Sequence, residues 1–108
     1  MAKPQAYLST QLTESYWPPE TSRQLLDWTL GRALREAATV APDRAALVEG
    51  LADGLAARRW SYAELVAASE RVAFALLERF QPGERVAVWA SNVPEWQLLF
   101  YGCAMAGI

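Results

Sequence analysis

The sequence has no histidine, and only one cysteine and one lysine among its 108 residues. The missing histidine excludes a His-based general base, a His-ligated metal and a Ser-His-Asp triad within this chain. The single cysteine, Cys103, excludes an internal disulfide and a cysteine-rich zinc site. Residues 1–10 lack the apolar region of a secretory signal, and the longest apolar run, 98–108, is too short to span a bilayer. We therefore expect a soluble, cytoplasmic protein with no transmembrane segment.

The composition is that of a small globular domain. Apolar residues make up 53% of the chain and charged residues 20%, which argues against a disordered or acidic tail. The formal net charge is −2, with acidic and basic residues interspersed. Because no basic face is large, we expect no nucleic-acid partner.

Residues 1–28 are interpreted as an extended N-terminal arm. Pro18 and Pro19 favour an extended path and exclude helix at Trp17. Two interpretations stay open: a partly ordered tail, or a strap whose Trp17 packs on a larger body.

The next segment predicts a helix followed by a β-hairpin. Thr29 suits the N-cap of a helix whose apolar residues recur every three or four positions, and Pro42 stops this helix. The short apolar run 45–49 predicts a strand, and 58–61 predicts its returning partner. Between them, the pair Asp53-Gly54 is a turn signal.

Ser61 gives the strongest local signal in the chain. The Ser61 hydroxyl can accept from the Glu64 amide while the Glu64 carboxylate accepts from the Ser61 amide, which is a capping box. We expect a helix over about 62–79, ended by the turn at 81–84. Its buried stripe is predicted to hold Leu65, Ser69, Val72, Leu76 and Phe80, flanked by Ala68 and Ala73.

The last part of the sequence predicts a strand and a buried helix. Residues 85–90 are almost continuously apolar, which is typical of an inner parallel strand. A helix over 94–106 follows, apolar or small at nearly every position, with Gly107 as its C-terminal cap. This arrangement demands a second parallel strand, which would begin at Ile108. We therefore expect the N-terminal fragment of a longer protein; the alternative is a natural 108-residue protein that hides these apolar surfaces in an oligomer.

No residue is a candidate for catalysis, cofactor binding or metal binding. Ser91 and Asn92 stand at a helix N-terminus where doubly wound folds bind ligands, yet capping is the commoner role of such residues, and we favour it. The six glycines form no phosphate-binding loop. Glu64 and Glu70 are not paired for acid–base work.

Four conspicuous residues are assigned to packing. Trp89 and Trp96 lie in apolar elements and are expected in the core. Gly102, on a buried helix, is expected to be a close-packing site. Cys103, which has glycine, alanine and methionine around it, is expected to be an inert apolar residue.

Six segments carry a family resemblance. They are the helix from Thr29 to Ala41, Pro42–Val48, Trp60–Leu65, Pro82–Val88, Asn92–Trp96 and Ala104–Ile108. In this order they resemble the N-terminus of AMP-forming acyl-CoA synthetases, which belong to the adenylate-forming ligase superfamily. The resemblance covers about residues 29–108. It implies an α/β fold: the N-terminal part of the large domain, with helix, β-hairpin, helix, inner parallel strand and helix, incomplete as it stands.

The resemblance also implies an ATP-dependent acid–CoA ligase acting on a fatty or aryl acid. In such enzymes a carboxylate and ATP give an acyl-adenylate and pyrophosphate, and CoA then displaces AMP. The phosphate-binding loop and the catalytic lysine lie further downstream, and Lys3, the only lysine, matches no family motif. This chain alone is therefore expected to be inactive. ATP, Mg²⁺ and CoA are expected only in the parent enzyme, whose remaining large domain, small C-terminal domain and small carboxylic acid substrate are the expected partners.

Two alternatives stay open. The parent would instead be an acyl-AMP ligase or adenylation domain that loads a carrier protein, because nothing in these residues decides the acceptor. In a different class, the chain would be a small non-catalytic α/β module that binds a partner through helix 94–106. A reading frame that continues into a Gly/Ser/Thr-rich loop with a lysine would favour either enzyme over the module.

Overall fold

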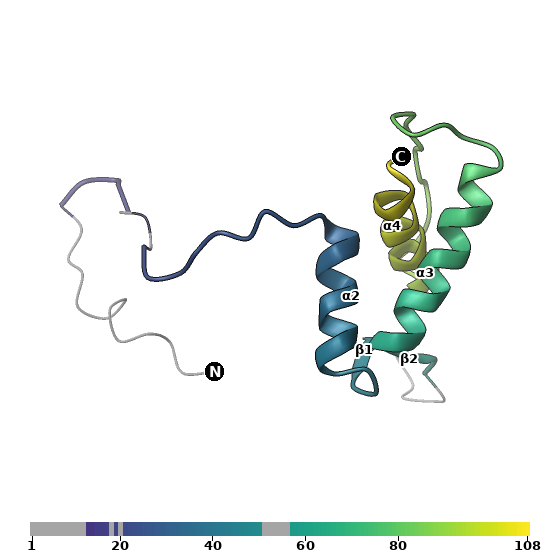
Figure 1. Ribbon diagram of the computed structural model, residues 1–108, viewed down its shortest axis with the longest axis horizontal. Helices are drawn as coiled ribbons and strands as arrows, with labels where there is room; N and C mark the ends of the chain where they lie inside the picture. The colour runs from purple at the N-terminus through teal and green to yellow at the C-terminus, as the bar shows by residue number, and fades with distance from the viewer. Residues whose placement is uncertain (1–12, 18, 20, 51–56) are drawn as a thin grey trace.

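The computed structural model describes residues 13–17, 19, 21–50 and 57–108. Three helices pack on one another, and a two-stranded sheet lies at one end of them (Figure 1). Residues 21–29, before the first of these helices, lead away from them as extended chain. The expected turn at Asp53-Gly54 lies outside the described residues. In chain order the elements are α2 (Leu30–Val40), β1 (Ala45–Val48), β2 (Arg59–Ser61), α3 (Tyr62–Leu77) and α4 (Pro94–Ala106).

The start and the end of α2 are those that the sequence predicts. The Thr29 hydroxyl oxygen accepts a hydrogen bond from the Arg32 amide at 3.2 Å, as an N-cap does. The helix ends with Ala41 as its C-cap, directly before Pro42. Both predictions are therefore confirmed.

The two predicted strands form an antiparallel hairpin. Ala45 lies opposite Ser61 and Val48 opposite Arg59, with an irregularity of register between Ala45 and Leu47. The hairpin leads directly into α3, because Ser61 is both the last residue of β2 and the N-cap of the helix.

The capping box at the start of α3 is confirmed. The Glu64 amide donates to the Ser61 hydroxyl at 3.2 Å, and the Ser61 amide donates to the Glu64 carboxylate at 2.8 Å. The helix ends at Leu77, two residues before the predicted end. Of the predicted stripe, Leu65 and Ser69 are buried, whereas Val72, Leu76 and Phe80 are half-buried. The two flanking residues, Ala68 and Ala73, are buried as well.

α3 and α4 approach each other closely at Gly102. A methyl group added there would lie 2.5 Å from Val72 Cγ1 and 3.3 Å from the Ala73 nitrogen. The predicted close-packing role of Gly102 is therefore confirmed. Gly107 ends α4 with φ of 76°, a left-handed conformation that glycine adopts without strain, and the Ile108 amide donates to the Cys103 carbonyl at 3.0 Å.

Residues 85–90 form no strand in the described structure, so the inner parallel strand is not confirmed. A strand requires a neighbour for its backbone groups, and β1 and β2 pair only with each other. The expected core positions of the two tryptophans are also wrong for this structure. Trp89 is 103% exposed and Trp96 is 41% exposed, because no described element covers this segment.

Candidate functional site

The start of α4 differs from the prediction. Val93, not Ser91 or Asn92, is the N-cap, and no side chain caps the helix. The reason is Pro94: the residue before a proline is held in the extended region, and Val93 has φ of −120° and ψ of 155°. Ser91 and Asn92 therefore lie too early in the chain to cap α4, and the capping prediction is wrong.

Both residues instead line open hollows beside the N-terminus of α4. A hollow of about 350 Å³ separates the end of β1 from α4, and Asn92, Gln97 and Glu49 give it polar walls. A second hollow, of about 310 Å³, is lined by Ser91 as well as by Asn92 and Gln97. The structure thus brings the predicted pair Ser91 and Asn92 together with Gln97.

An ionic cluster beside the first hollow was not predicted. Arg58 donates through Nε and Nη2 to the two oxygens of Glu49, each at 2.8 Å. The same guanidinium binds Glu95 in the first turn of α4, through Nη1 and through Nη2 at 3.2 Å. The guanidinium carbon also lies 5.5 Å from the centre of the Trp60 ring, over its face.

The cluster changes the titration of all three charged groups. Hydrogen bonds from Arg58 lower the pKa values of Glu49 and Glu95 below the ordinary glutamate value. Hydrogen bonds to Glu49 and then to Glu95 raise the pKa of Arg58 above its ordinary value. Each ionised partner therefore favours the charged form of the other. No sequence signal predicted the cluster, because its members are 9 and 37 positions apart.

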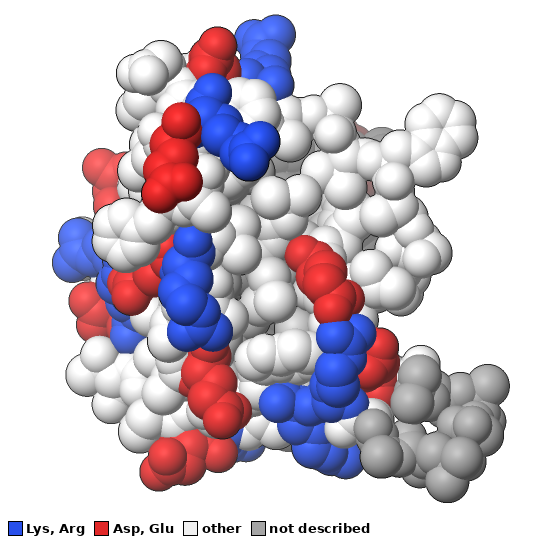
Figure 2. Space-filling model, turned by 90° about the vertical axis from the view of Figure 1, so that its right-hand side faces the viewer, with Lys and Arg blue, Asp and Glu red and all other residues white. Residues whose placement is uncertain are grey.

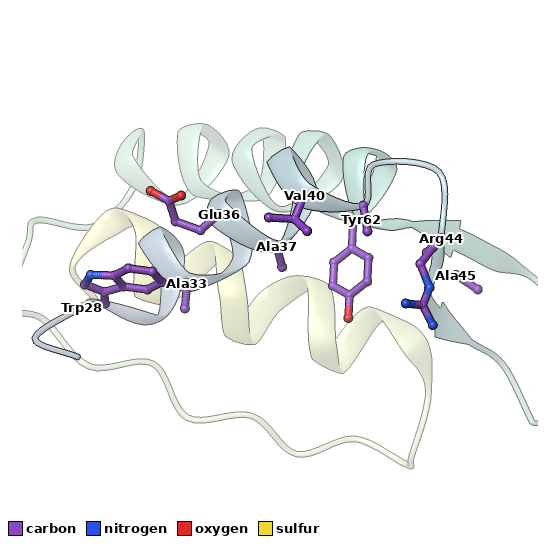
Figure 3. A pocket seen from close by; sticks show the side chains of 9 residues that line it. Trp28, Ala33, Glu36, Ala37, Val40, Arg44, Ala45 and Tyr62 are labelled. Carbon is purple, nitrogen blue, oxygen red and sulfur yellow. The ribbon is translucent and has the colours of Figure 1, made fainter. Parts of the chain in front are cut away.

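A larger hollow, of about 530 Å³, lies along α2 (Figure 3). Small and apolar side chains form most of its wall, with Trp28 near one end and Arg44 near the other. Glu36 and the Tyr62 phenol are its other polar groups. It therefore has the character of an uncovered helix face rather than of a site with convergent polar groups.

An apolar surface joins residues 86–89 to α4. Trp96 and Phe100 stack with ring centres 6.0 Å apart, and both are exposed. A hollow of about 230 Å³ lies between these rings, Val86, Val88 and the half-buried Cys103. Figure 2 shows an uncharged area bordered by charged side chains of both signs. A surface of this kind is typical of a face that another part of a protein covers.

The described residues do not fit a nucleotide–metal centre. They include no lysine, and they contain no group of three or more His, Cys, Asp or Glu residues that would hold a metal ion. Glu64 serves the capping box, and Glu70 pairs with Arg35 at 3.0 Å. We therefore assign no step of a reaction to these side chains. In the described part of the chain, no helix is both long enough and apolar enough to cross a membrane.

The described residues thus form a β-hairpin and three packed helices, with apolar surfaces on α2 and α4 that no other described element covers. The model of the AMP-binding enzyme family matches residues 34–108, and the chain belongs to this family.

Two curated relatives agree with the family match. The medium-chain acyl-CoA ligase ACSF2, mitochondrial, of Danio rerio is 34% identical over 98 residues, which are 90% of this chain and 16% of the relative. The putative acyl-CoA synthetase YngI of Bacillus subtilis is 32% identical over 85 residues, which are 78% of this chain and 15% of the relative. The chain thus spans about a sixth of the length of these relatives. No solved structure matches it significantly.

Proposed function

We propose that this chain is the N-terminal part of the large domain of an AMP-forming acid–CoA ligase. The parent enzyme would join a carboxylate to ATP, giving an acyl-adenylate and pyrophosphate, and then transfer the acyl group to CoA with release of AMP. The observation that carries the proposal is the family match over 34–108, supported by two relatives whose names are those of acyl-CoA ligases.

The proposed substrate is a fatty acid. The name of the Danio rerio relative specifies medium-chain acyl groups, which favours a fatty over an aryl acid. ATP, Mg²⁺ and CoA would be bound by other segments of the parent, since the described residues offer no set that fits them. We further propose that the enzyme is cytoplasmic.

In the parent, residues 29–108 would belong to the large domain and 1–28 would form an arm before it. The uncovered face of α4 and residues 85–90 would pack against the remainder of the large domain. Residues 85–90 would then become an inner parallel strand, because their backbone groups have no partner strand among the described residues. The small C-terminal domain would complete the enzyme.

The test is acid-dependent exchange between ATP and pyrophosphate. We expect the longer natural chain to exchange with medium-chain fatty acids, to respond less to aryl acids, and to consume CoA. The 108-residue chain should give no exchange. Exchange without turnover of CoA, but with loading of an acyl carrier protein, would identify a carrier-loading ligase instead. A monodisperse 108-residue product from a true stop codon, without exchange, would favour a non-catalytic module.

A further inference from the structure

A single guanidinium joins two parts of the fold that otherwise scarcely touch. α4 packs on α3 and α2, and the β1–β2 hairpin packs on α3. Between the described residues of the hairpin and α4, direct packing is slight. Arg58 bridges this gap, because it binds Glu49 at the end of β1 and Glu95 in the first turn of α4.

We propose that Arg58 is a latch that holds the hairpin on the first turn of α4 and so fixes the turn at 91–93. This turn lies two to four residues before Glu95, and Val93 and Pro94 line the hollow of about 350 Å³ together with Glu49. The latch therefore lies beside this hollow, and its Glu49 is part of the hollow's wall. When it opens, the hairpin and the 91–93 turn move independently while α3 stays folded.

The geometry requires an arginine. Its planar fork presents separate N–H groups to the two carboxylates, and Glu49 receives two parallel bonds of 2.8 Å. The Glu49 side chain is only 18% exposed, so it anchors the guanidinium on the hairpin side. Glu95 is 56% exposed and forms the half of the contact that solvent reaches most easily. The latch therefore opens first at Glu95.

The effect is local. Exposed ion pairs contribute little to global stability. We therefore expect the Arg58 contacts to fix the positions of the hairpin and the first turn of α4 rather than to stabilise the whole fold. α3 and α4 remain joined through Gly102, so opening the latch does not separate them. This distinguishes a latch from a core contact, whose loss would loosen the whole fold.

Hydrogen exchange in the full natural chain tests the proposal. We expect Arg58→Gln and Glu95→Gln to raise amide exchange several-fold at 92–97 and at 45–49, with exchange at 62–77 unchanged. Arg58→Lys should give an intermediate increase, because an ammonium cannot bind both carboxylates in the same fork. Arg59→Gln is the matched control, because Arg59 is the residue next to Arg58 and carries the same charge. Arg59 forms no ion pair with a described acidic residue, so its loss should leave the latch intact.

Two further measurements complete the test. The effects of Arg58→Gln and Glu95→Gln should be far from additive, since both break the same contact. High salt should raise exchange at 92–97 in the unsubstituted chain and have little effect in Arg58→Gln. Unchanged exchange at 92–97 in Arg58→Gln, or equal loss of protection along α3, would overturn the latch. Neither readout uses catalysis, so the proposed function can fail without affecting this result.

Discussion

The α3–α4 contact and the segment 85–93 are neighbours in sequence but opposite in structure. At the contact, Gly102 lets two helices approach so closely that a methyl group would not fit. In the segment, Trp89 is fully exposed and the backbone of 85–90 pairs with no described strand. The first region satisfies its packing within this chain, whereas the second presents apolar surface for something else to cover. Apolar composition alone therefore does not show where a core forms. An apolar segment becomes part of a core only where another element packs against it.

Gly102→Ala is the most damaging way to break the closely packed region. The added methyl would lie 2.5 Å from Val72 Cγ1, so the helices must move apart. Overpacking of this kind costs about 1–3 kcal/mol, and the higher helix propensity of alanine offsets up to about 1 kcal/mol of it. We expect a net loss of about 1–2 kcal/mol in the free energy of unfolding, measured by denaturant titration.

Two variants control this experiment. Gly50→Ala should be nearly neutral, because no atom of the described residues lies within 4 Å of the added methyl. Val72→Ala in the Gly102→Ala background should restore part of the loss by removing the nearest methyl. If Gly102→Ala is as stable as the original chain, the helices do not approach as described.

Ser61→Ala should have the next largest effect. The substitution removes the hydroxyl that accepts from the Glu64 amide at 3.2 Å and leaves that amide without its cap. An N-cap of this type contributes about 1 kcal/mol, so we expect that loss in stability. Activity of the parent enzyme at low temperature should be unchanged. A large loss of turnover without loss of stability would mean that Ser61 acts in the reaction.

These two regions also show what a sequence can predict. The capping box at Ser61 and the N-cap at Thr29 depend on residues three positions apart, so their spacing alone identifies them. The length of α4 follows from Pro94 at its start and Gly107 at its end. Gly102 was predictable as a close contact because a glycine inside an apolar helix has little other use.

The remaining features depend on contacts that spacing does not encode. Arg58 meets Glu95 across 37 positions, which no local pattern reports. The capping prediction at Asn92 failed because Pro94 holds Val93 extended and makes it the N-cap. The strand prediction at 85–90 was based on the apolar pattern of these residues. A strand also needs a neighbouring strand for its backbone hydrogen bonds, and the pattern does not show whether one is present.

Acid should weaken the ionic contact between the hairpin and α4. Hydrogen bonds from Arg58 lower the pKa values of Glu49 and Glu95, so their contribution is complete above the ordinary glutamate pKa of about 4.3. It is lost as the pH falls through the lowered values. In the original chain, the protection factors at 92–97 should therefore decrease when the pH is lowered below about 4. In Arg58→Gln they should be low at all pH values; a parallel decline in both chains would contradict this cause.

Trp89→Ser is expected to have the smallest effect in this chain and a large one in a longer chain. Trp89 is 103% exposed, so its loss should change the stability of the 108-residue chain by less than about 0.5 kcal/mol. If the remainder of a large domain covers residues 85–90, the same substitution removes a buried indole and costs about 3–5 kcal/mol. Denaturant titrations of both chains measure the difference, with Thr21→Ser as a control at an exposed position of the arm. Equal and small effects in the two chains would show that this face stays uncovered, and would remove the main structural argument that residues 85–90 become an inner strand.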